Sequence, residues 1–448
     1  DAYRGRIVDR DGRLLVHNSP IFDLNVVMND VEIEDTTQFC EILQMTRQDF
    51  DHRMAVIKAD DKHYSRYKPY PFISRISAQQ YALVQDIFNY KGFDFHPTIE
   101  RKYPHSNFSL GLGYLAKISG SELRRDKESG DSYYRGVDYL GKTGIEKTYE
   151  KQLRGQRGTE YILVNVKGVK QGSYADGDGD TIAKAGMNLQ STIDLELQSY
   201  GELLMKNKLG SLVAIEPSTG EILALVSGPS YDPNVLSGPD YSKNYQKLFE
   251  DQNKPLFNRT IQSQYPPGSI FKIAQSLVLM QNKIIGPYQK INVSVRPSIM
   301  GDHAPSGAYD VTRAIQLSSN TFYRLLMGRM IEQKTDKSQF IDARYGLRIW
   351  TESMNRLGLG VRLGIDLPSE AKGLIPSVSF YDNVVGENQW KYSNFRSVSI
   401  GQGEVQMTPL QMANLAALIA NRGFYVRPPV IRTGNDTWTP INSGIDSI

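Results

Sequence analysis

The sequence predicts an α+β protein with more than one domain. Its 448 residues exceed the usual size of a single domain and favour two or three. Hydrophobic residues make up 40% and charged residues 23%, the composition of a folded globular chain. Strand-like alternation and helix-like apolar spacing both occur, and the character of the sequence changes across a turn-rich stretch at 173–186. We therefore expect one domain over residues 1–185 and a second over residues 186–448.

Charge and cysteine content exclude several classes of protein. The 52 basic and 49 acidic residues leave a net charge of +3, which is too balanced to indicate a nucleic-acid surface. Cys40 is the one cysteine, so no intrachain disulfide can form. No window of 18 apolar residues predicts a membrane span. Because the chain starts at Asp1 without an initiator Met, we expect an excised soluble portion whose anchor or targeting segment would lie upstream.

The first domain is expected to combine a strand hairpin with polar helices. Residues 4–28 alternate like strands on both sides of an Asp-Gly turn signal. From residue 34 to about residue 135, apolar residues recur at helical spacing, so this region is expected to be helical with a thin core. Residues 141–158 predict a helix that ends at Gly155, and a strand follows it.

The second domain is expected to begin with a helix and a hairpin. Residues 191–208 predict an amphipathic helix, with Thr192 as a candidate N-cap. Two continuous apolar runs flank the turn Pro217–Gly220 and predict a hairpin whose strands are buried on both faces. The remainder is mostly helical and closes with a helix that ends at Gly423.

Three S-x-x-K matches suggest a serine activated by a lysine. Residues i and i+3 of a helix lie on one face, about 5–6 Å apart at Cβ, so the amine reaches the hydroxyl only within one helical turn. Ser65–Lys68 precedes Pro-Tyr-Pro and Ser369–Lys372 lies between Pro and Gly, so neither is expected to be helical. Ser269–Lys272 follows a Pro-Pro-Gly turn and opens an apolar run typical of a buried helix.

The start of a buried helix favours nucleophilic catalysis at Ser269. The helix dipole stabilises negative charge near its oxygen, and a free backbone N–H there could donate to an oxyanion. Burial lowers the pKa of a lysine such as Lys272 and makes its neutral amine available as a base. The alternative is an N-capping serine with a lysine that extends to solvent, and the four letters alone do not separate the two.

A second motif supplies a partner for the lysine. Ser318-Ser319-Asn320 is an S-x-N between two helical runs, and its side chains can hold a lysine and relay a proton. A second S-x-N, Ser242–Asn244, lies in a polar loop and is the poorer candidate. The alternative for residues 318–320 is a helix cap, because Ser and Asn favour that position.

The third motif of this kind of site is K-T-G, since S-x-x-K, an S-D-N type motif and K-T-G together mark penicillin-binding proteins and class A β-lactamases. Lys142–Gly144 has these letters, but it precedes the serine and opens a predicted helix. The chemistry needs an edge strand that can pair with an extended peptide, so we interpret this match as accidental. Arg432-Thr433-Gly434 follows the serine in the chain, as K-T-G should, but it resembles that motif only weakly.

Two patterns that suggest metal binding fail on inspection. The DGDGD stretch at 176–180 resembles the start of a calcium loop, but Thr181 and Met187 stand where that loop requires Gly and Glu. Asp302-His303 has no cysteine or second histidine nearby in the sequence. We expect no metal and no cofactor.

Taken in order, the motifs resemble those of the class B penicillin-binding proteins, and among these the elongation type, the penicillin-binding protein 2 group. The resemblance covers nearly the whole chain, so it is far more specific than any single motif. The matching segments are 4–18, 101–115, 141–158, 210–234, 258–272, 318–320 and 399–423.

The resemblance implies an elongated N-terminal pedestal of the dimerisation type, with strands and a helical head. A transpeptidase domain follows, with a helix-flanked antiparallel sheet like that of β-lactamases. It implies that Ser269 attacks the penultimate D-Ala carbonyl of a stem pentapeptide, with Lys272 as base. Ser318 would relay the proton to the leaving amine, and Asn320 would hold the donor amide. β-Lactams would acylate the same serine.

The resemblance also implies a peptidoglycan D,D-transpeptidase of cell-wall elongation at the periplasmic face of the bacterial inner membrane, with a single N-terminal anchor outside this chain. The expected partners are D-Ala-D-Ala stem peptides, β-lactam antibiotics and a membrane glycosyltransferase of the elongation machinery, and no nucleic acid. The family's third motif follows the last helix after a long insertion, so we expect a C-terminally truncated chain. A scaffold or activator subunit, and a β-lactamase or β-lactam sensor, remain alternatives.

Overall fold

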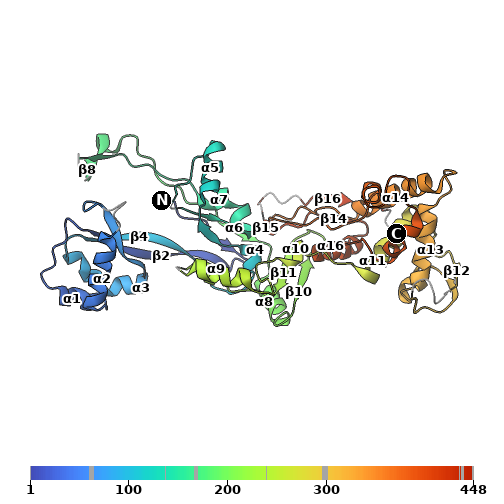
Figure 1. The fold of residues 1–448 in the computed structure, drawn as a ribbon, viewed down its shortest axis with the longest axis horizontal. Helices are drawn as coiled ribbons and strands as arrows, with labels where there is room; N and C mark the ends of the chain where they lie inside the picture. Colours follow the sequence, from blue (N-terminus) through green and yellow to red (C-terminus); the bar gives the residue numbers. More distant parts are fainter. Residues whose placement is uncertain are drawn as a thin grey trace. The chain divides into compact units, whose positions relative to one another are not determined.

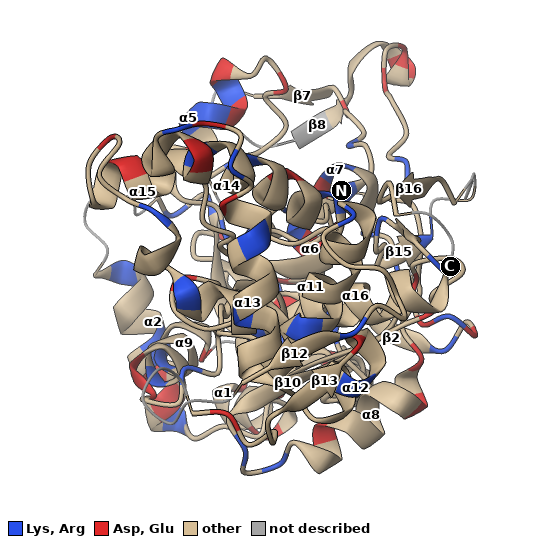
Figure 2. Ribbon diagram, turned by 90° about the vertical axis from the view of Figure 1, so that its right-hand side faces the viewer, with Lys and Arg blue, Asp and Glu red and all other residues tan. Residues whose placement is uncertain are grey.

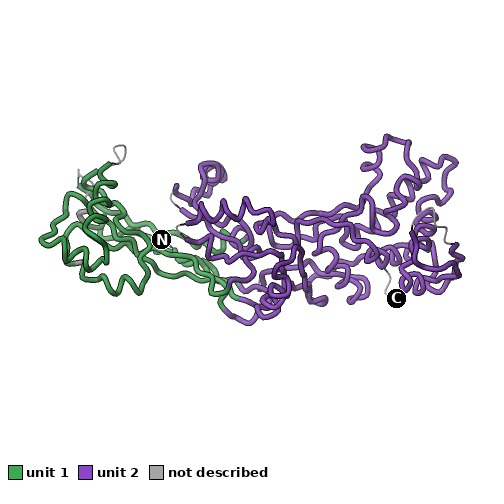
Figure 3. The backbone as a smooth tube through the Cα atoms, turned by 60° about the horizontal axis from the view of Figure 1, so that its bottom comes forward, with its two compact units in different colours: residues 1–8, 14–105, 149–189 green, residues 9–13, 106–148, 190–448 purple. Residues whose placement is uncertain are grey.

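The computed structural model describes residues 2–59, 65–136, 138–165, 170–238, 240–294, 301–432, 434 and 438–445. Its helices and strands follow one another as drawn in Figure 1. The chain forms two compact units, coloured separately in Figure 3: unit 1 comprises 1–8, 14–105 and 149–189, and unit 2 comprises 9–13, 106–148 and 190–448. Helices and strands are mixed in both units, so the α+β class is confirmed. The domain boundary expected at 185/186 stays a prediction.

Strand β2 is the central strand of unit 1. β2 (Leu14–Val27) pairs antiparallel with β3 (Pro69–Ser77) and with β4 (Phe93–Lys102). The short β1 (Ile7–Val8) pairs antiparallel with the start of β2, so the predicted N-terminal hairpin is confirmed.

The expectation of helices throughout residues 34–135 is wrong for β3 and β4. Both segments alternate between the core and solvent, and their inward phenylalanines meet helices α1 (Thr36–Ile42) and α2 (Arg47–Lys58). The ring of Phe39 on α1 lies 4.6 Å from that of Phe93 and 5.5 Å from that of Phe50, between centroids. Tertiary packing therefore overrides the local helical spacing.

The helix predicted for residues 141–158 divides into α6 (Gly144–Thr148) and α7 (Glu150–Arg154). It ends at Gly155, whose φ of +71° lies in the left-handed region, as predicted. The strand that follows is β7 (Ile162–Val164), and the DGDGD stretch lies in a turn after β8 (Lys170–Ser173), so both predictions are confirmed. Of these two helices, α6 belongs to unit 2 and α7 to unit 1. The remaining elements of unit 1 are α3 (Ala78–Leu83), η1 (Gln85–Asn89), β7, β8 and η2 (Tyr174–Gly177).

Unit 2 contains the predicted hairpin, formed by β10 (Gly210–Ile215) and β11 (Ile222–Gly228). β11 is largely buried, whereas β10 is half-buried along its length, so the expectation that both strands are buried is wrong for β10. Helix α8 (Leu195–Leu204) begins at Asp194, whose carboxylate accepts two backbone N–H groups, and not at Thr192 as predicted. The hydroxyl of Thr192 instead donates to the carbonyl of Ile222.

Three helices form the buried centre of unit 2: α11 (Phe271–Gln281), α13 (Asn320–Ile331) and α14 (Gln339–Arg356). The indole N–H of Trp350 on α14 donates to Gln275 on α11 over 2.9 Å. α16 (Pro409–Ala420) packs against β10, and the turn after it reaches Gly423 as predicted. Among the described residues no helix has the length and apolarity needed to cross a membrane.

The remaining elements of unit 2 are short, and β5 pairs with β6, β12 with β13, and β14 with β16. In the view of Figure 2, basic and acidic segments are interspersed over the helices, which agrees with the small net charge. These elements are α4 (Ser109–Leu112), β5 (Leu115–Lys117), α5 (Gly120–Glu128), β6 (Tyr139–Gly141), η3 (Pro233–Leu236), α9 (Tyr241–Glu250), α10 (Arg259–Gln262), η4 (Gly268–Ile270), β12 (Ile291–Val293), β13 (Gly307–Tyr309), α12 (Val311–Gln316), α15 (Val378–Val384), η5 (Tyr392–Asn394), η6 (Arg396–Ile400), β14 (Phe424–Val426), β15 (Ile431–Arg432) and β16 (Pro440–Asn442); β9 (Leu189–Ser191) begins at the last residue of unit 1.

Candidate active site

Ser269 lies in a tight turn that leads directly into α11. The turn is the single 3-10 turn η4, and Ser269 within it is exposed to solvent. The backbone N–H of Gly268 donates to the carbonyl of Gly401 over 2.9 Å, and Tyr265 and Met407 exchange two backbone hydrogen bonds of 2.9 Å. These hydrogen bonds with segment 401–407 fix the backbone of the turn, and the side chain of Ser269 remains accessible to solvent.

Lys272 is buried on the first turn of α11, with 2% of its surface exposed. Its Nζ donates to the carbonyl oxygen of Ser318 (2.6 Å), to Ser318 Oγ (2.9 Å) and to Asn320 Oδ1 (2.6 Å). Burial lowers the pKa of Lys272, and the negative charge of Asp302 partly opposes that shift. The ring centroid of Tyr323 lies 5.9 Å from Nζ. The amine is therefore held inside the protein and does not extend to solvent.

The hydroxyl of Ser318 connects the lysine to the serine. Ser318 Oγ donates to Ser269 Oγ over 2.9 Å and accepts from Lys272 Nζ. Among the described residues, Lys272 makes no direct hydrogen bond to Ser269. The spacing of S-x-x-K alone suggested direct contact between lysine and serine, whereas the structure inserts one hydroxyl between them. A proton leaving Ser269 can reach the amine through that hydroxyl.

The S-x-N motif serves two purposes. Its middle residue, Ser319, is the N-cap of α13, since its Oγ accepts the N–H of Phe322 over 3.3 Å. The flanking residues Ser318 and Asn320 bind Lys272. The helix-cap interpretation and the functional interpretation therefore apply to different residues of one motif.

Two residues of the site escaped sequence reasoning. The carbonyl of Gly301 accepts Asn320 Nδ2 over 2.7 Å. The Asp302 carboxylate accepts from Ser319 Oγ (3.0 Å) and from the N–H of Thr321 (2.7 Å). Burial would raise the pKa of Asp302, but these hydrogen bonds outweigh it and lower the pKa. From the sequence, Asp302 was considered only as a metal ligand, and rejected as one, because no sequence pattern shows that Asp302 contacts the S-x-N turn.

The other motif matches lie apart from these residues or take part in local contacts. Neither Ser65–Lys68 nor Ser369–Lys372 is helical, as expected. Lys142 Nζ pairs with Glu122 over 2.6 Å just before α6, which agrees with an accidental match. Ser242–Asn244 lies in helix α9, so the expectation that it lies in a polar loop is wrong, and the Asn244 amide donates to the carbonyl of Val235. Arg432 pairs with Glu221, and the next residue of that match, Thr433, lies outside the described residues.

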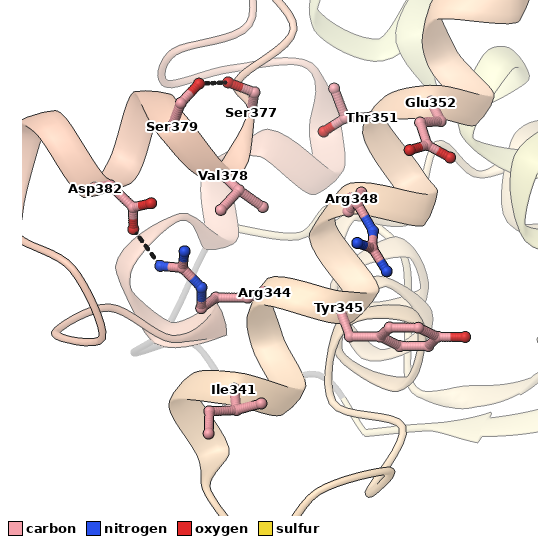
Figure 4. A pocket seen from close by; sticks show the side chains of 10 residues that line it. All are labelled: Ile341, Arg344, Tyr345, Arg348, Thr351, Glu352, Ser377, Val378, Ser379 and Asp382. Atoms are coloured by element: carbon pink, nitrogen blue, oxygen red, sulfur yellow. Dashed lines mark hydrogen bonds and ion pairs between the residues drawn. The ribbon is translucent and has the colours of Figure 1, made fainter.

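A cavity of about 650 Å³ lies between α14 and the start of α15, shown in Figure 4. Arg344 and Asp382 form an ion pair across it, and the guanidinium of Arg348 lies 5.6 Å from the ring centroid of Tyr345. None of the four candidate site residues lines this cavity. Over the described ranges, no group of three or more His, Cys, Asp or Glu side chains is arranged to hold a metal ion.

Two family models match the chain. The one described as penicillin-binding protein dimerisation domain matches residues 1–191. The one described as penicillin binding protein transpeptidase domain matches residues 210–444, which include all four candidate site residues.

Curated relatives match over nearly the whole chain. The "Peptidoglycan D,D-transpeptidase MrdA" of Acinetobacter baumannii is 31% identical over 441 residues, 96% of this chain and 62% of the relative. The protein of the same name in Salmonella typhimurium is 30% identical over 445 residues, 96% of this chain and 67% of the relative. The chain thus spans roughly two thirds of the length of these relatives.

Solved structures share the fold. The Helicobacter pylori penicillin-binding protein (PBP2) in complex with MreC has a TM-score of 0.77 at 24% identity, over 99% of this chain and 80% of that one. The Pseudomonas aeruginosa PBP2 in complex with WCK 5153 has a TM-score of 0.64 at 24% identity, over 98% and 74%. The expected architecture, a dimerisation pedestal joined to a transpeptidase domain, is confirmed at the level of the fold.

Proposed function

The chain belongs to the penicillin-binding proteins that join a dimerisation domain to a transpeptidase domain, and we propose that it acts as a peptidoglycan D,D-transpeptidase of cell-wall elongation. The observation that carries this proposal is the hydrogen-bonded series from Lys272 Nζ through Ser318 Oγ to Ser269 Oγ. An exposed hydroxyl joined by a relay to a desolvated amine is an arrangement suited to acyl transfer.

Acylation begins with a neutral lysine. With three hydrogen bonds donated from Nζ, the arrangement described is that of the ammonium form. After Lys272 loses a proton, its lone pair accepts from Ser318 Oγ, which in turn accepts the proton of Ser269. The freed Ser269 oxygen attacks the penultimate D-Ala carbonyl of a stem peptide. The proton returns through Ser318 to the leaving amine of the terminal D-Ala, and the C–N bond breaks.

The second half of the reaction repeats these steps with a different nucleophile. The amine of a neighbouring stem peptide attacks the acyl-enzyme, gives its proton to the relay, and displaces Ser269. The new amide is the peptide cross-link. Asn320, whose amide donates to Gly301 and accepts from Lys272, is suited to hold the donor peptide near the serine. A β-lactam follows the first half alone, with the ring C–N bond as the bond that breaks.

Labelling with a fluorescent penicillin, followed by peptide mapping, tests the proposal. We expect one adduct on Ser269, which is lost in Ser269→Ala. The matched control is Ser65→Ala, which removes the serine of another S-x-x-K match and leaves labelling intact. Absence of an adduct on Ser269 from the wild-type protein contradicts the proposal.

A β-lactamase or β-lactam sensor is the second enzymatic candidate, since it shares the serine–lysine chemistry. The dimerisation-domain match over residues 1–191 favours the transpeptidase. The lifetime of the penicillin adduct separates the two. Release of the label within seconds, with regeneration of free Ser269, favours the β-lactamase.

We further propose that the protein acts at the periplasmic face of the bacterial inner membrane, beside a membrane glycosyltransferase of the elongation machinery. Support comes from two similar solved structures, one a complex of PBP2 with MreC and the other a peptidoglycan synthase complex. A scaffold role through unit 1 can coexist with catalysis. If Ser269→Ala sustains cell shape as the wild type does, while changes confined to unit 1 abolish it, the scaffold role dominates.

A further inference from the structure

Asp302 holds the S-x-N turn through residues that do not bond to the lysine. One carboxylate oxygen, Oδ2, accepts from Ser319 Oγ over 3.0 Å and from the backbone N–H of Thr321 over 2.7 Å. The other, Oδ1, accepts from the N–H of Ala304 over 3.1 Å, which fixes the carboxylate to its own segment. Asp302 therefore bonds to two alternate residues of the turn, Ser319 and Thr321.

The intervening residues bond to the lysine. Ser318 and Asn320 accept from Lys272 Nζ, and the Asn320 amide also donates to the carbonyl of Gly301. Ser318 has a φ of +51°, a left-handed conformation that costs an L-residue about 1–2 kcal/mol. Such a backbone persists only where its surroundings hold it. Here the backbone of Ser318 is held by its hydrogen bonds with Lys272, and the residues that follow it are held by their hydrogen bonds with segment 301–302.

The charge of Asp302 also reaches the lysine. Burial lowers the pKa of Lys272, and the Asp302 carboxylate acts in the opposite direction. The groups that bond to the amine are neutral, because Ser318 offers a hydroxyl and a carbonyl and Asn320 an amide, and burial raises the pKa of the nearby Tyr323 to about 12.

From this geometry we infer that Asp302 is a positioning residue for acyl transfer, one that fixes the Ser319–Thr321 backbone so that Ser318 Oγ stays bonded to both Ser269 and Lys272. Over the described residues, Asp302 makes no hydrogen bond or ion pair with Ser269 or with Lys272 Nζ. The inference rests on the proposed function and adds a residue to it. A second consequence follows from the charge: Asp302 helps to set the pH at which the neutral amine of Lys272 becomes available.

The main test is Asp302→Asn, which keeps the shape of the side chain and removes its charge. An amide has a single acceptor oxygen, so it cannot accept from Ser319 and Thr321 at one position and from the N–H of Ala304 at the other. We expect the second-order rate constant for acylation by a fluorescent penicillin to fall by about 10²-fold, the typical effect of a displaced catalytic group. Without the carboxylate, Lys272 loses its proton at lower pH, so the rising limb of the pH–rate profile is expected to move to lower pH.

Three further variants distinguish the effect of the Asp302 hydrogen bonds on acylation from the effect of its charge and from a general loss of stability. Ser319→Ala removes the hydrogen bond to Asp302 and the N-cap bond from Phe322 but retains the charge of Asp302, so a smaller fall in rate with an unmoved rising limb is expected. Asp342→Asn is the matched control: this carboxylate accepts the N–H groups of Lys334 and Thr335 and the hydroxyl of Thr335, outside the site. It is expected to lower thermal stability and leave acylation unchanged. His303→Gln, next to Asp302 in the chain, is expected to leave the limb unmoved.

A readout that needs no acylation keeps the two proposals distinguishable. NMR titration of ¹³Cε-labelled lysine, assigned by Lys272→Met, reports the pKa of Lys272 directly, and Asp302→Asn is expected to lower it. A wild-type protein that is never labelled contradicts the transpeptidase proposal, while the titration still decides the role of Asp302. Wild-type rates and an unshifted Lys272 titration in Asp302→Asn overturn the inference. The inference is also overturned if Asp302→Asn lowers the acylation rate without moving the rising limb of the pH–rate profile, and Asp342→Asn lowers the rate to the same extent.

Discussion

At the scale of residues, the candidate site is organised around one buried lysine. Lys272 is 2% exposed, and its three hydrogen bonds compensate for the loss of water around the ammonium group. Its role depends on two residues nearly fifty positions away in the sequence. Four residues of the candidate site were predicted from motifs, whereas Gly301 and Asp302 were not, because neither a lone glycine carbonyl nor a lone carboxylate has a spacing signature.

Replacing Lys272 separates catalysis from folding. Lys272→Met keeps a chain of similar length and removes the base, so the acylation rate constant is expected to fall by about 10²–10⁴-fold. Ser318 is exposed, so water can satisfy the oxygens that the amine leaves, and the thermal midpoint is expected to change little. Stopped-flow labelling and thermal unfolding measure the two effects. Lys243→Met on α9 is the control, and a Lys272→Met protein that acylates at the wild-type rate contradicts the prediction.

Lys142 offers a pH-dependent prediction on a residue outside the site. Burial would raise the pKa of Glu122, but hydrogen bonds from Lys142 and Ser119 outweigh it and lower the pKa from 4.5 to about 2. A carboxyl with a depressed pKa stabilises the folded state above its unfolded pKa, and that contribution is lost as the pH falls toward 2. Because the pair is partly exposed, we expect Lys142→Met to cost about 1 kcal/mol above pH 5.

Urea unfolding over a pH series measures this effect, with Lys147→Met as the control. The difference between Lys142→Met and the wild type is expected to shrink steadily between pH 4.5 and pH 2. Labelling of Ser269 is expected to be unaffected in Lys142→Met. Loss of labelling in this variant would show that the accidental K-T-G interpretation is wrong.

At the scale of elements, the position of the turn that carries Ser269 depends on a segment far along the chain. The N–H of Gly268 donates to the carbonyl of Gly401, which has a φ of +71°. A Cβ on Gly401 would lie 2.5 Å from the Gly268 carbonyl oxygen and 2.5 Å from Phe271 Cβ. Helix α11 therefore begins where it does partly because residue 401 has no side chain.

Gly401→Ala tests this close approach. The left-handed backbone and the contact with two neighbouring residues are expected to cost together about 2–4 kcal/mol of unfolding free energy. Acylation is expected to slow because Gly268 must shift beside Ser269. Gly130→Ala is the matched control, since Gly130 has a φ of +80° and a Cβ there would meet nothing within 4 Å. Chemical unfolding of both variants is the measurement, and equal losses contradict a specific role for Gly401.

At the scale of the whole molecule, each compact unit has buried residues of its own. Phe39 is fully buried in unit 1 and packs against the rings of Phe50, Phe72 and Phe93. In unit 2, Phe322 of α13 is equally buried. The units therefore have separate hydrophobic cores, and damage to one core is expected to leave the other intact.

Phe39→Ala is expected to destabilise unit 1 by about 3–5 kcal/mol and leave the labelling of Ser269 unchanged. Phe322→Ala, the matched change in unit 2, is expected to reduce labelling. Calorimetry, combined with labelling after mild heating, measures both effects. If Phe39→Ala abolishes labelling at low temperature, the two cores are not independent.

The sequence by itself determined the class of fold, the N-terminal hairpin and the ends of α7 and α16, and it picked out the serine, lysine and S-x-N residues that the structure brings together in the candidate site. These features depend on local turn chemistry, capping and short helical spacings, which a sequence records directly. The strands β3 and β4, the relay hydroxyl between Lys272 and Ser269, and the grip of Asp302 on the S-x-N turn were decided only by tertiary structure. Each depends on which distant segments meet, and contacts between distant segments are set by packing of the whole core and not by any local pattern.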